Sequence, residues 1–127
     1  DKQIEYNIDI PEQPFRVKLD ADSYMRILNN LIQNVLAHSQ ADRIGIIMQK
    51  QSGTVQILLE DNGIGIGKDD LKYIFDRLYK CDKGRSEKGS GLGLSIVYQL
   101  VEKMNGRITV ESEEGKGTVF TVTFPLL

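Results

Sequence analysis

Four clusters of carboxamide, carboxylate and glycine residues could do chemistry in this sequence. The first is Asn30-Leu31-Ile32-Gln33-Asn34, in which two asparagines lie four positions apart. In a helix, that spacing puts both side chains on one edge. An asparagine carbonyl oxygen is a neutral, hard ligand suited to Mg²⁺, which takes its other ligands from water and phosphates. For an isolated pair, two solvent-facing side chains are the alternative.

The second cluster is Asp61-Asn62-Gly63-Ile64-Gly65-Ile66-Gly67, a carboxylate at the end of a strand-like run followed by glycine at every second position. Backbone without side chains lets a flat ligand approach closely. A carboxylate can accept a hydrogen bond from an exocyclic amine such as that of adenine. A plain strand-to-helix turn is the alternative interpretation.

The third cluster, Gly89-Ser90-Gly91-Leu92-Gly93-Leu94, opens a helical pattern. Free N–H groups and the positive end of the helix dipole make such a start attractive to anions. Its spacing fits neither the G-x-G-x-x-G dinucleotide pattern nor the G-x-x-x-x-G-K-[ST] phosphate loop. The fourth cluster, Gly115-Lys116-Gly117-Thr118, would by itself indicate only a hairpin turn.

Three helices are expected to position these clusters. Apolar residues from Tyr24 to Leu36 recur at i, i+3, i+4 and i+7, which predicts an amphipathic helix capped by Asp20 and ending near Ser39. A second stripe runs from Leu92 to Met104, and Gly106 is expected as the left-handed residue that ends it. A shorter helix is expected across residues 71–78.

Short alternating or β-branched runs predict strands. They cover residues 4–10, 15–19, 44–48, 55–59, 108–110 and 120–124, and the first two are expected to be joined by a turn. Because the strands come in adjacent pairs, we predict an α+β fold of two layers, with a mixed, mostly antiparallel sheet and about three helices on one face. Threonines at 109, 121 and 123 indicate that the other face is partly polar.

The composition fits a single globular domain. The 127 residues are 40% apolar and 27% charged, with net charge −2, one cysteine and one histidine. The longest apolar runs fall far short of the ~20 residues needed to span a bilayer, and no signal-peptide pattern opens the chain. One cysteine and one histidine cannot form a disulfide or a four-ligand zinc site, so we expect a reducing, cytoplasmic setting. The near-neutral charge favours neither nucleic acid nor anionic lipid as a partner.

Taken in order, the four clusters resemble the histidine-kinase-type ATPase domain over nearly the whole chain. That family has an asparagine box, a first glycine box, a phenylalanine box, a second glycine box and a glycine-threonine box, and Phe75 stands at the third of these. The resemblance implies an ATP-binding and Mg²⁺-binding catalytic domain over residues 1–127. It would be excised from a larger, membrane-anchored sensor kinase, without the dimerisation and phosphoacceptor domain.

The resemblance also implies roles for individual residues. Asn34 would coordinate magnesium, Asn30 would lie close to the phosphates, and Asp61 would bind the adenine amine. Gly63 and Gly65 would shape the adenine pocket, and Thr118 would hold water near the base. Tyr79 and Lys80 match the aromatic-basic pair that follows the phenylalanine box. The phosphates would be faced by the second glycine box, which is Gly89, Gly91, Leu92 and Gly93.

Two positions separate this chain from relatives of the same fold. The family often has a basic residue three positions after the magnesium asparagine, but this chain has Ala37, so Lys80, Arg77 or cations of residues 80–90 would have to neutralise phosphate. In the gyrase, heat-shock chaperone and mismatch-repair ATPases, a glutamate four residues before that asparagine activates water. Asn30 stands there instead and offers no general base, which favours a kinase over a hydrolase.

The resemblance implies partners beyond this chain. The family's phosphoacceptor histidine lies on a preceding two-helix dimerisation domain, so those helices and, indirectly, a response regulator are the expected partners. His38, the only histidine, is either a structural residue or one near phosphate. A stand-alone serine/threonine kinase of the anti-sigma type and a non-enzymatic nucleotide sensor remain alternatives.

Residues 80–90 are expected to form a mobile lid over a bound triphosphate. The segment has four basic and two acidic side chains, almost no apolar content, and glycines at 84 and 89. Its positive charge would be drawn toward phosphate oxygens. A surface loop that does not respond to ligand is the alternative.

Overall fold

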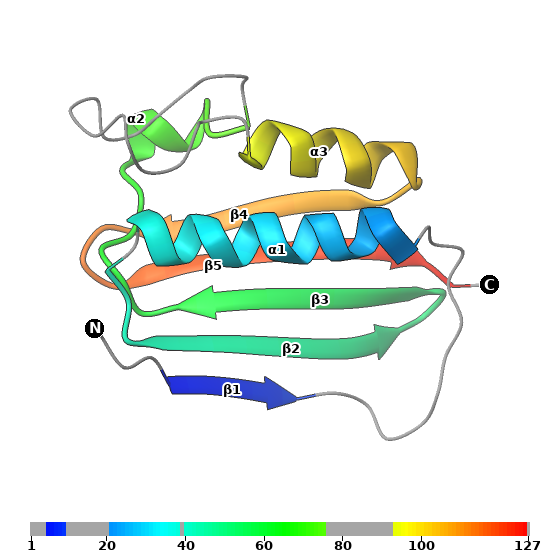
Figure 1. Cartoon of the computed structure of the whole chain (residues 1–127), viewed down its shortest axis with the longest axis horizontal. Helices are drawn as coiled ribbons and strands as arrows, with labels where there is room; N and C mark the ends of the chain where they lie inside the picture. The colour runs from blue at the N-terminus through cyan, green and yellow to red at the C-terminus, as the bar shows by residue number, and fades with distance from the viewer. Residues whose placement is uncertain (1–4, 10–20, 39, 76–92, 127) are drawn as a thin grey trace.

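A computed structural model describes residues 5–9, 21–38, 40–75 and 93–126 of the chain. Along the sequence (Figure 1) the elements are β1 (Glu5–Asp9), α1 (Ala21–His38), β2 (Arg43–Gln51), β3 (Thr54–Asp61), α2 (Lys68–Leu71), α3 (Gly93–Lys103), β4 (Arg107–Glu113) and β5 (Gly117–Pro125). None of the helices in these ranges is long and apolar enough to cross a membrane. The expected strand at 15–19 and the expected lid at 80–90 lie outside the described residues.

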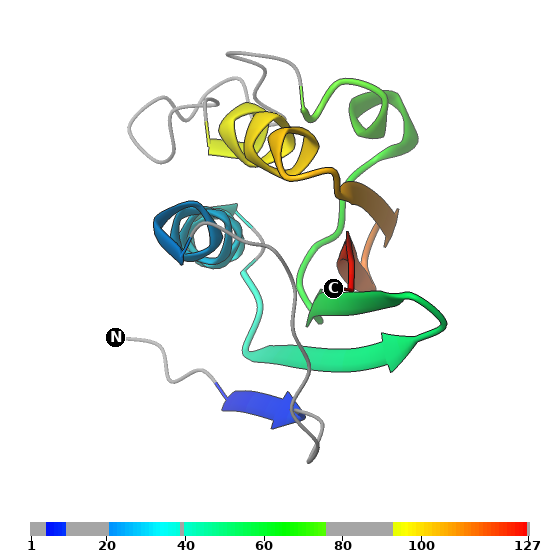
Figure 2. The same ribbon diagram turned by 90° about the vertical axis from the view of Figure 1, so that its right-hand side faces the viewer.

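Five strands form one mixed sheet in the order β1-β2-β3-β5-β4. β1 pairs with β2 in parallel, and all other neighbours are antiparallel. The helices α1 and α3 lie side by side against one face, as the two views in Figure 1 and Figure 2 show. The predicted two-layer α+β fold is therefore confirmed, as are the hairpins β2–β3 and β4–β5.

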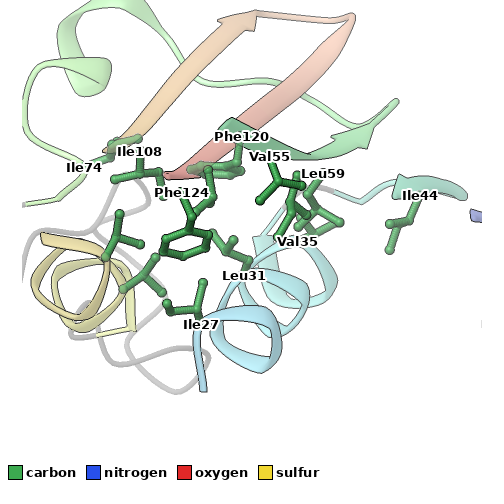
Figure 3. Close-up of a cluster of buried hydrophobic side chains, with 14 of the residues drawn as sticks. Ile27, Leu31, Val35, Ile44, Val55, Leu59, Ile74, Ile108, Phe120 and Phe124 are labelled. Carbon is green, nitrogen blue, oxygen red and sulfur yellow. The ribbon is translucent and has the colours of Figure 1, made fainter. Parts of the chain in front are cut away.

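The core lies between the two helices and the sheet (Figure 3). The α1 stripe contributes Ile27, Leu31 and Val35, each at most 2% exposed, as its helical spacing predicts. On β5, every second residue from Thr118 to Phe124 is buried, because strand side chains alternate between faces. The other buried side chains of this cluster come mostly from β3, α3 and β4; they are Val55, Ile57, Leu59, Val97, Val101 and Ile108, with Ala41, Ile44 and Ile74.

The opposite face of the sheet carries the predicted threonines. Thr109 and Thr121 face each other across the β4–β5 pair, one position out of phase with buried Val122. Thr123 lies on the same side of β5, and all three are at least partly exposed. The prediction of a partly polar face without helices is confirmed.

Two local predictions were wrong. The helix expected across residues 71–78 is absent from the described part of that range, because α2 ends at Leu71 and turns follow to Phe75; residues 76–78 lie outside the described residues. The left-handed residue after α3 is Asn105 (φ 61°), not Gly106. Gly106 is glycine for a different reason, because a Cβ there would lie 2.7 Å from the Phe124 ring. Asparagine tolerates the left-handed region, and the N–H of Gly106 still bonds the carbonyl of Val101 at 2.9 Å, which closes the helix end.

Candidate functional site

Asp61 ends the strand β3 on the helix-covered face, in register with Ile44 of β2 and Thr118 of β5. It is partly buried, and its Oδ1 accepts a hydrogen bond from the N–H of Gly63 at 2.8 Å. Burial raises the pKa of the Asp61 carboxyl above its ordinary value, and N–H donors of Gly63 and Thr118 oppose that rise. The site therefore holds a half-buried carboxylate with lone pairs left for a ligand donor.

The second and fourth sequence clusters, at residues 61–67 and 115–118, touch each other backbone to backbone. Gly65 has φ 76°, and a Cβ there would lie 2.2 Å from the carbonyl oxygen of Glu113. Gly117 has φ 135°, and a Cβ there would lie 2.0 Å from the carbonyl oxygen of Asp61. The N–H of Gly115 donates to Ile64 O at 2.7 Å across the same junction. Gly65 and Gly117 are thus needed for close backbone contact between two segments of the chain. The sequence-based interpretation of these glycines as a surface for a ligand did not include this role.

A serine hydroxyl joins the two clusters. Ser112 Oγ accepts from the N–H of Ile66 at 2.7 Å and donates to the carbonyl of Gly117 at 2.9 Å. It also lies 2.7 Å from the hydroxyl oxygen of Thr118, which is 5% exposed. Because the single Ser112 proton goes to Gly117, the Thr118 hydroxyl donates to Ser112 and presents its own lone pairs to the site.

A second polar group, the amide of Asn62, bonds the loop of residues 61–67 (the Asp61 loop) to the residues at the start of β2. Asn62 Oδ1 accepts from the backbone N–H groups of Asp42 and Arg43, at 3.1 and 3.0 Å, and Asn62 Nδ2 donates to Asp42 Oδ1 at 2.7 Å. Sequence reasoning did not assign a role to Ser112 or Asn62. The only signal for Asn62 was its place inside the Asp-x-Gly-x-Gly motif, and for Ser112 a polar residue at an inward position of an alternating strand.

Asn30 and Asn34 lie on α1, as predicted, and both are partly buried. They flank the buried stripe on one side, and Leu28 and Ile32 flank it on the other. Among the residues that the structure describes, neither carboxamide forms a hydrogen bond. Val35, next to Asn34, and Leu59, near the end of β3, belong to the same buried core (Figure 3).

The structure brings Asp61, Gly63, Gly65 and Thr118 together at one end of the sheet. Gly93 begins α3, and the phenylalanine-box residue Phe75 packs against Tyr98 and Phe120 with ring centroids 5.5 and 6.5 Å apart. The other predicted site residues lie outside the described ranges; they are Tyr79, Lys80, Gly89, Gly91 and Leu92, with Arg77.

Comparison with protein families matches residues 19–127 to the family described as histidine kinase-, DNA gyrase B-, and HSP90-like ATPase. The chain belongs to this family. The match includes the asparagines of α1, the Asp61 loop and the Thr118 hairpin, so the resemblance inferred from the motifs is confirmed.

Its relatives in the family include sensor kinases. The chain is 35% identical over 130 residues to the sensor histidine kinase WalK of Bacillus subtilis, covering 98% of this chain and 21% of that protein. The mycobacterial sensor histidine kinase MprB has a TM-score of 0.83 at 29% identity, covering 97% of this chain and 84% of the solved one. Full-length ShkA in complex with AMPPNP has a TM-score of 0.79 at 26% identity over 98% of this chain. The chain thus spans about a fifth of the WalK sequence that it matches.

Proposed function

We propose that the chain binds ATP with magnesium and transfers the γ-phosphate to a histidine on the dimerisation helices of a sensor kinase, for relay to a response regulator. The observation that carries this proposal is the junction between the clusters at residues 61–67 and 115–118. There, Asp61 and Thr118 sit side by side as acceptors at the end of a sheet. Sensor histidine kinases among the relatives support the choice of acceptor. A cytoplasmic position of the domain follows from this role.

The residues present suit the groups they would bind. Asp61 would accept from the adenine amine, with Gly63 and Gly65 shaping the pocket and Thr118 holding water beside the base. The uncharged carbonyl oxygen of Asn34 would suit Mg²⁺, which prefers oxygen ligands and keeps several waters and phosphate oxygens. Magnesium would supply neutralisation of phosphate charge.

The remaining proposed roles concern the phosphates. Asn30 would lie near them, and Lys80 would neutralise charge in place of the cation missing at Ala37. Tyr79 and the glycine cluster at Gly89, Gly91, Leu92 and Gly93 would complete the nucleotide site.

Phosphoryl transfer to histidine fits this chain better than hydrolysis. An imidazole is already a nucleophile, so transfer depends chiefly on positioning and charge neutralisation. Hydrolysis requires a group that orients and deprotonates water, and Asn30, at the position of the hydrolytic glutamate in the related ATPases, has no useful basicity. We therefore expect slow ATP hydrolysis by the chain alone.

The test combines binding with transfer. Calorimetry of Mg-ATP and Mg-GTP should show a preference for ATP of at least roughly tenfold, because guanine presents a carbonyl oxygen where Asp61 needs a donor. Adding the dimerisation helices of a related sensor kinase should give acid-labile, base-stable label on their histidine. Binding without transfer would favour a nucleotide sensor, acid-stable label a serine/threonine kinase, and no ATP binding would refute the assignment.

A further inference from the structure

Asn62 joins two parts of the chain that carry different halves of the proposed site. It lies between Asp61 and Gly63, in the loop proposed to contact adenine. Its three hydrogen bonds reach Asp42, the last residue of the connection between α1 and β2, and Arg43, the first residue of β2. α1 ends at His38, one helical turn after Asn34. The amide of Asn62 therefore ties the loop that follows Asp61 to the segment that follows the asparagine helix α1.

The chemistry of this link requires an amide. Two backbone N–H groups need an acceptor, and the carboxylate of Asp42 at 2.7 Å needs a donor. Asparagine offers both on one short side chain, whereas aspartate offers only acceptors and alanine neither. An aspartate at 62 would place two carboxylates in contact.

We propose that Asn62 is a positioning residue for nucleotide binding, which holds the Asp61 loop in register with the C-terminal end of α1 so that one ATP molecule can contact both. This inference rests on the proposed function. Asp61 is already held by strand pairing with Ile44 and Thr118, so the amide is not needed to form β3. What it adds is a connection between the Asp61 loop and the segment that follows the helix proposed to bind magnesium.

If Asn62 had a merely structural role, its loss would lower the melting temperature and leave the gain in ATP affinity from Mg²⁺ unchanged. The positioning role predicts the opposite. Asn62 and Asp42 are both exposed, and hydrogen bonds in water contribute little net stability. Losing the link should therefore change the melting temperature only slightly. It should instead reduce the gain in ATP affinity that Mg²⁺ produces, because that gain requires both ends of the nucleotide to be held at once.

A charge-swap cycle tests this. Asn62→Asp should lower Mg-ATP affinity by about tenfold, which corresponds to about 1.4 kcal/mol. Asp42→Asn alone should be tolerated, because its amide can turn the carbonyl oxygen toward Asn62 Nδ2. The double variant restores a donor–acceptor pair with the polarity reversed, so its affinity should return to within about twofold of the Asp42→Asn variant. Asn29→Asp, on the exposed face of α1, controls for the added negative charge.

Each variant is measured by calorimetry with ATP, with and without Mg²⁺, and by thermal denaturation. The inference is supported if the affinity loss appears in Asn62→Asp, is rescued in the double variant and is absent from Asn29→Asp. It is overturned if Asn62→Asp binds like the unsubstituted chain, or if the double variant binds no better than Asn62→Asp. Should Asn62→Asp fold poorly, Asn62→Ala must show the same loss of the Mg²⁺-dependent gain. Failure of the unsubstituted chain to bind Mg-ATP would refute the proposed function, which is a separate result.

Discussion

Gly65 is the position where one added methyl group should do most damage. Its φ of 76° lies in the left-handed region, and a Cβ there would lie 2.2 Å from Glu113 O and 2.8 Å from the Glu113 carbonyl carbon. The obstacle is backbone at the end of β4, so it cannot move aside as a flexible side chain could. In Gly65→Ala, the Asp61 loop and the β4–β5 hairpin must therefore separate.

Gly115→Ala is the matched control. Gly115 has φ 83°, close to that of Gly65, but a Cβ there would meet nothing within 4 Å. Both substitutions cost about 1–2 kcal/mol for a left-handed alanine. Only Gly65→Ala should also break the junction, which includes the bonds from Gly115 N to Ile64 O and from Ile66 N to Ser112 Oγ. At about 0.5–1.5 kcal/mol for each bond, the total for Gly65→Ala reaches roughly 2–5 kcal/mol.

Thermal denaturation and Mg-ATP titration of both variants decide the matter. One kcal/mol corresponds to about 3–6 °C for a domain of this size, so Gly115→Ala should melt a few degrees lower and Gly65→Ala at least twice as far below the unsubstituted chain. Gly65→Ala should also lose adenine selectivity, because Asp61 and Thr118 no longer share one junction. Equal melting temperatures and equal ATP affinities for the two variants would refute this reasoning.

Three further predictions concern single side chains. Burial raises the pKa of Asp61, so the folded chain keeps that proton to higher pH than the unfolded chain, and stability falls as pH rises from the ordinary value of 3.8 through the raised one. Denaturant unfolding of Asp61→Asn across that range should lack this fall, leaving the variant at least as stable at pH 7 while calorimetry shows loss of ATP selectivity. Ser112→Ala removes the side-chain partner of the Ile66 N–H and of the Gly117 carbonyl and should cost about 1–3 kcal/mol in urea unfolding, whereas Ser52→Ala in the exposed β2–β3 turn should cost almost nothing. Asn34→Ala should reduce Mg²⁺-dependent ATP affinity at least about tenfold, and an equal loss in Gln33→Ala, on the exposed side of α1, would contradict the assignment.

The sequence predicted best those elements in which a regular hydrophobic repeat extends over many residues. α1 and α3 begin and end within about a residue or two of the expected positions, because burial of one stripe decides both their type and their extent. The helix predicted from residue 71 onward is replaced by turns at residues 72–75, since the apolar residues Leu71, Ile74 and Phe75 are equally compatible with a turn that packs on the core. Hydrophobic periodicity indicates which side chains are buried. In a short segment it does not show whether a helix or a turn buries them.

Strand partners were harder to predict than strands. The run at residues 4–10 was correctly read as a strand, but its observed partner is β2, reached in parallel across the whole length of α1. A local pattern contains no information on such a long-range pairing. The same limit applies to Ser112 and Asn62, whose partners lie 46 and 20 positions away in the chain.

The two ends of the proposed site are held in place by different interactions. Asp61 is held by register with strands on both sides and by a glycine junction that tolerates no Cβ at Gly65. Asn34 is placed only by the packing of α1 on the core, through neighbours such as Leu31 and Val35. Substitutions that loosen helix packing should therefore weaken the metal-dependent part of binding before they change adenine selectivity, because strand register can persist when a helix shifts on its sheet. The Asn62 amide, which ties the loop after Asp61 to Asp42 and Arg43 beyond the end of α1, is the polar link proposed to couple the two.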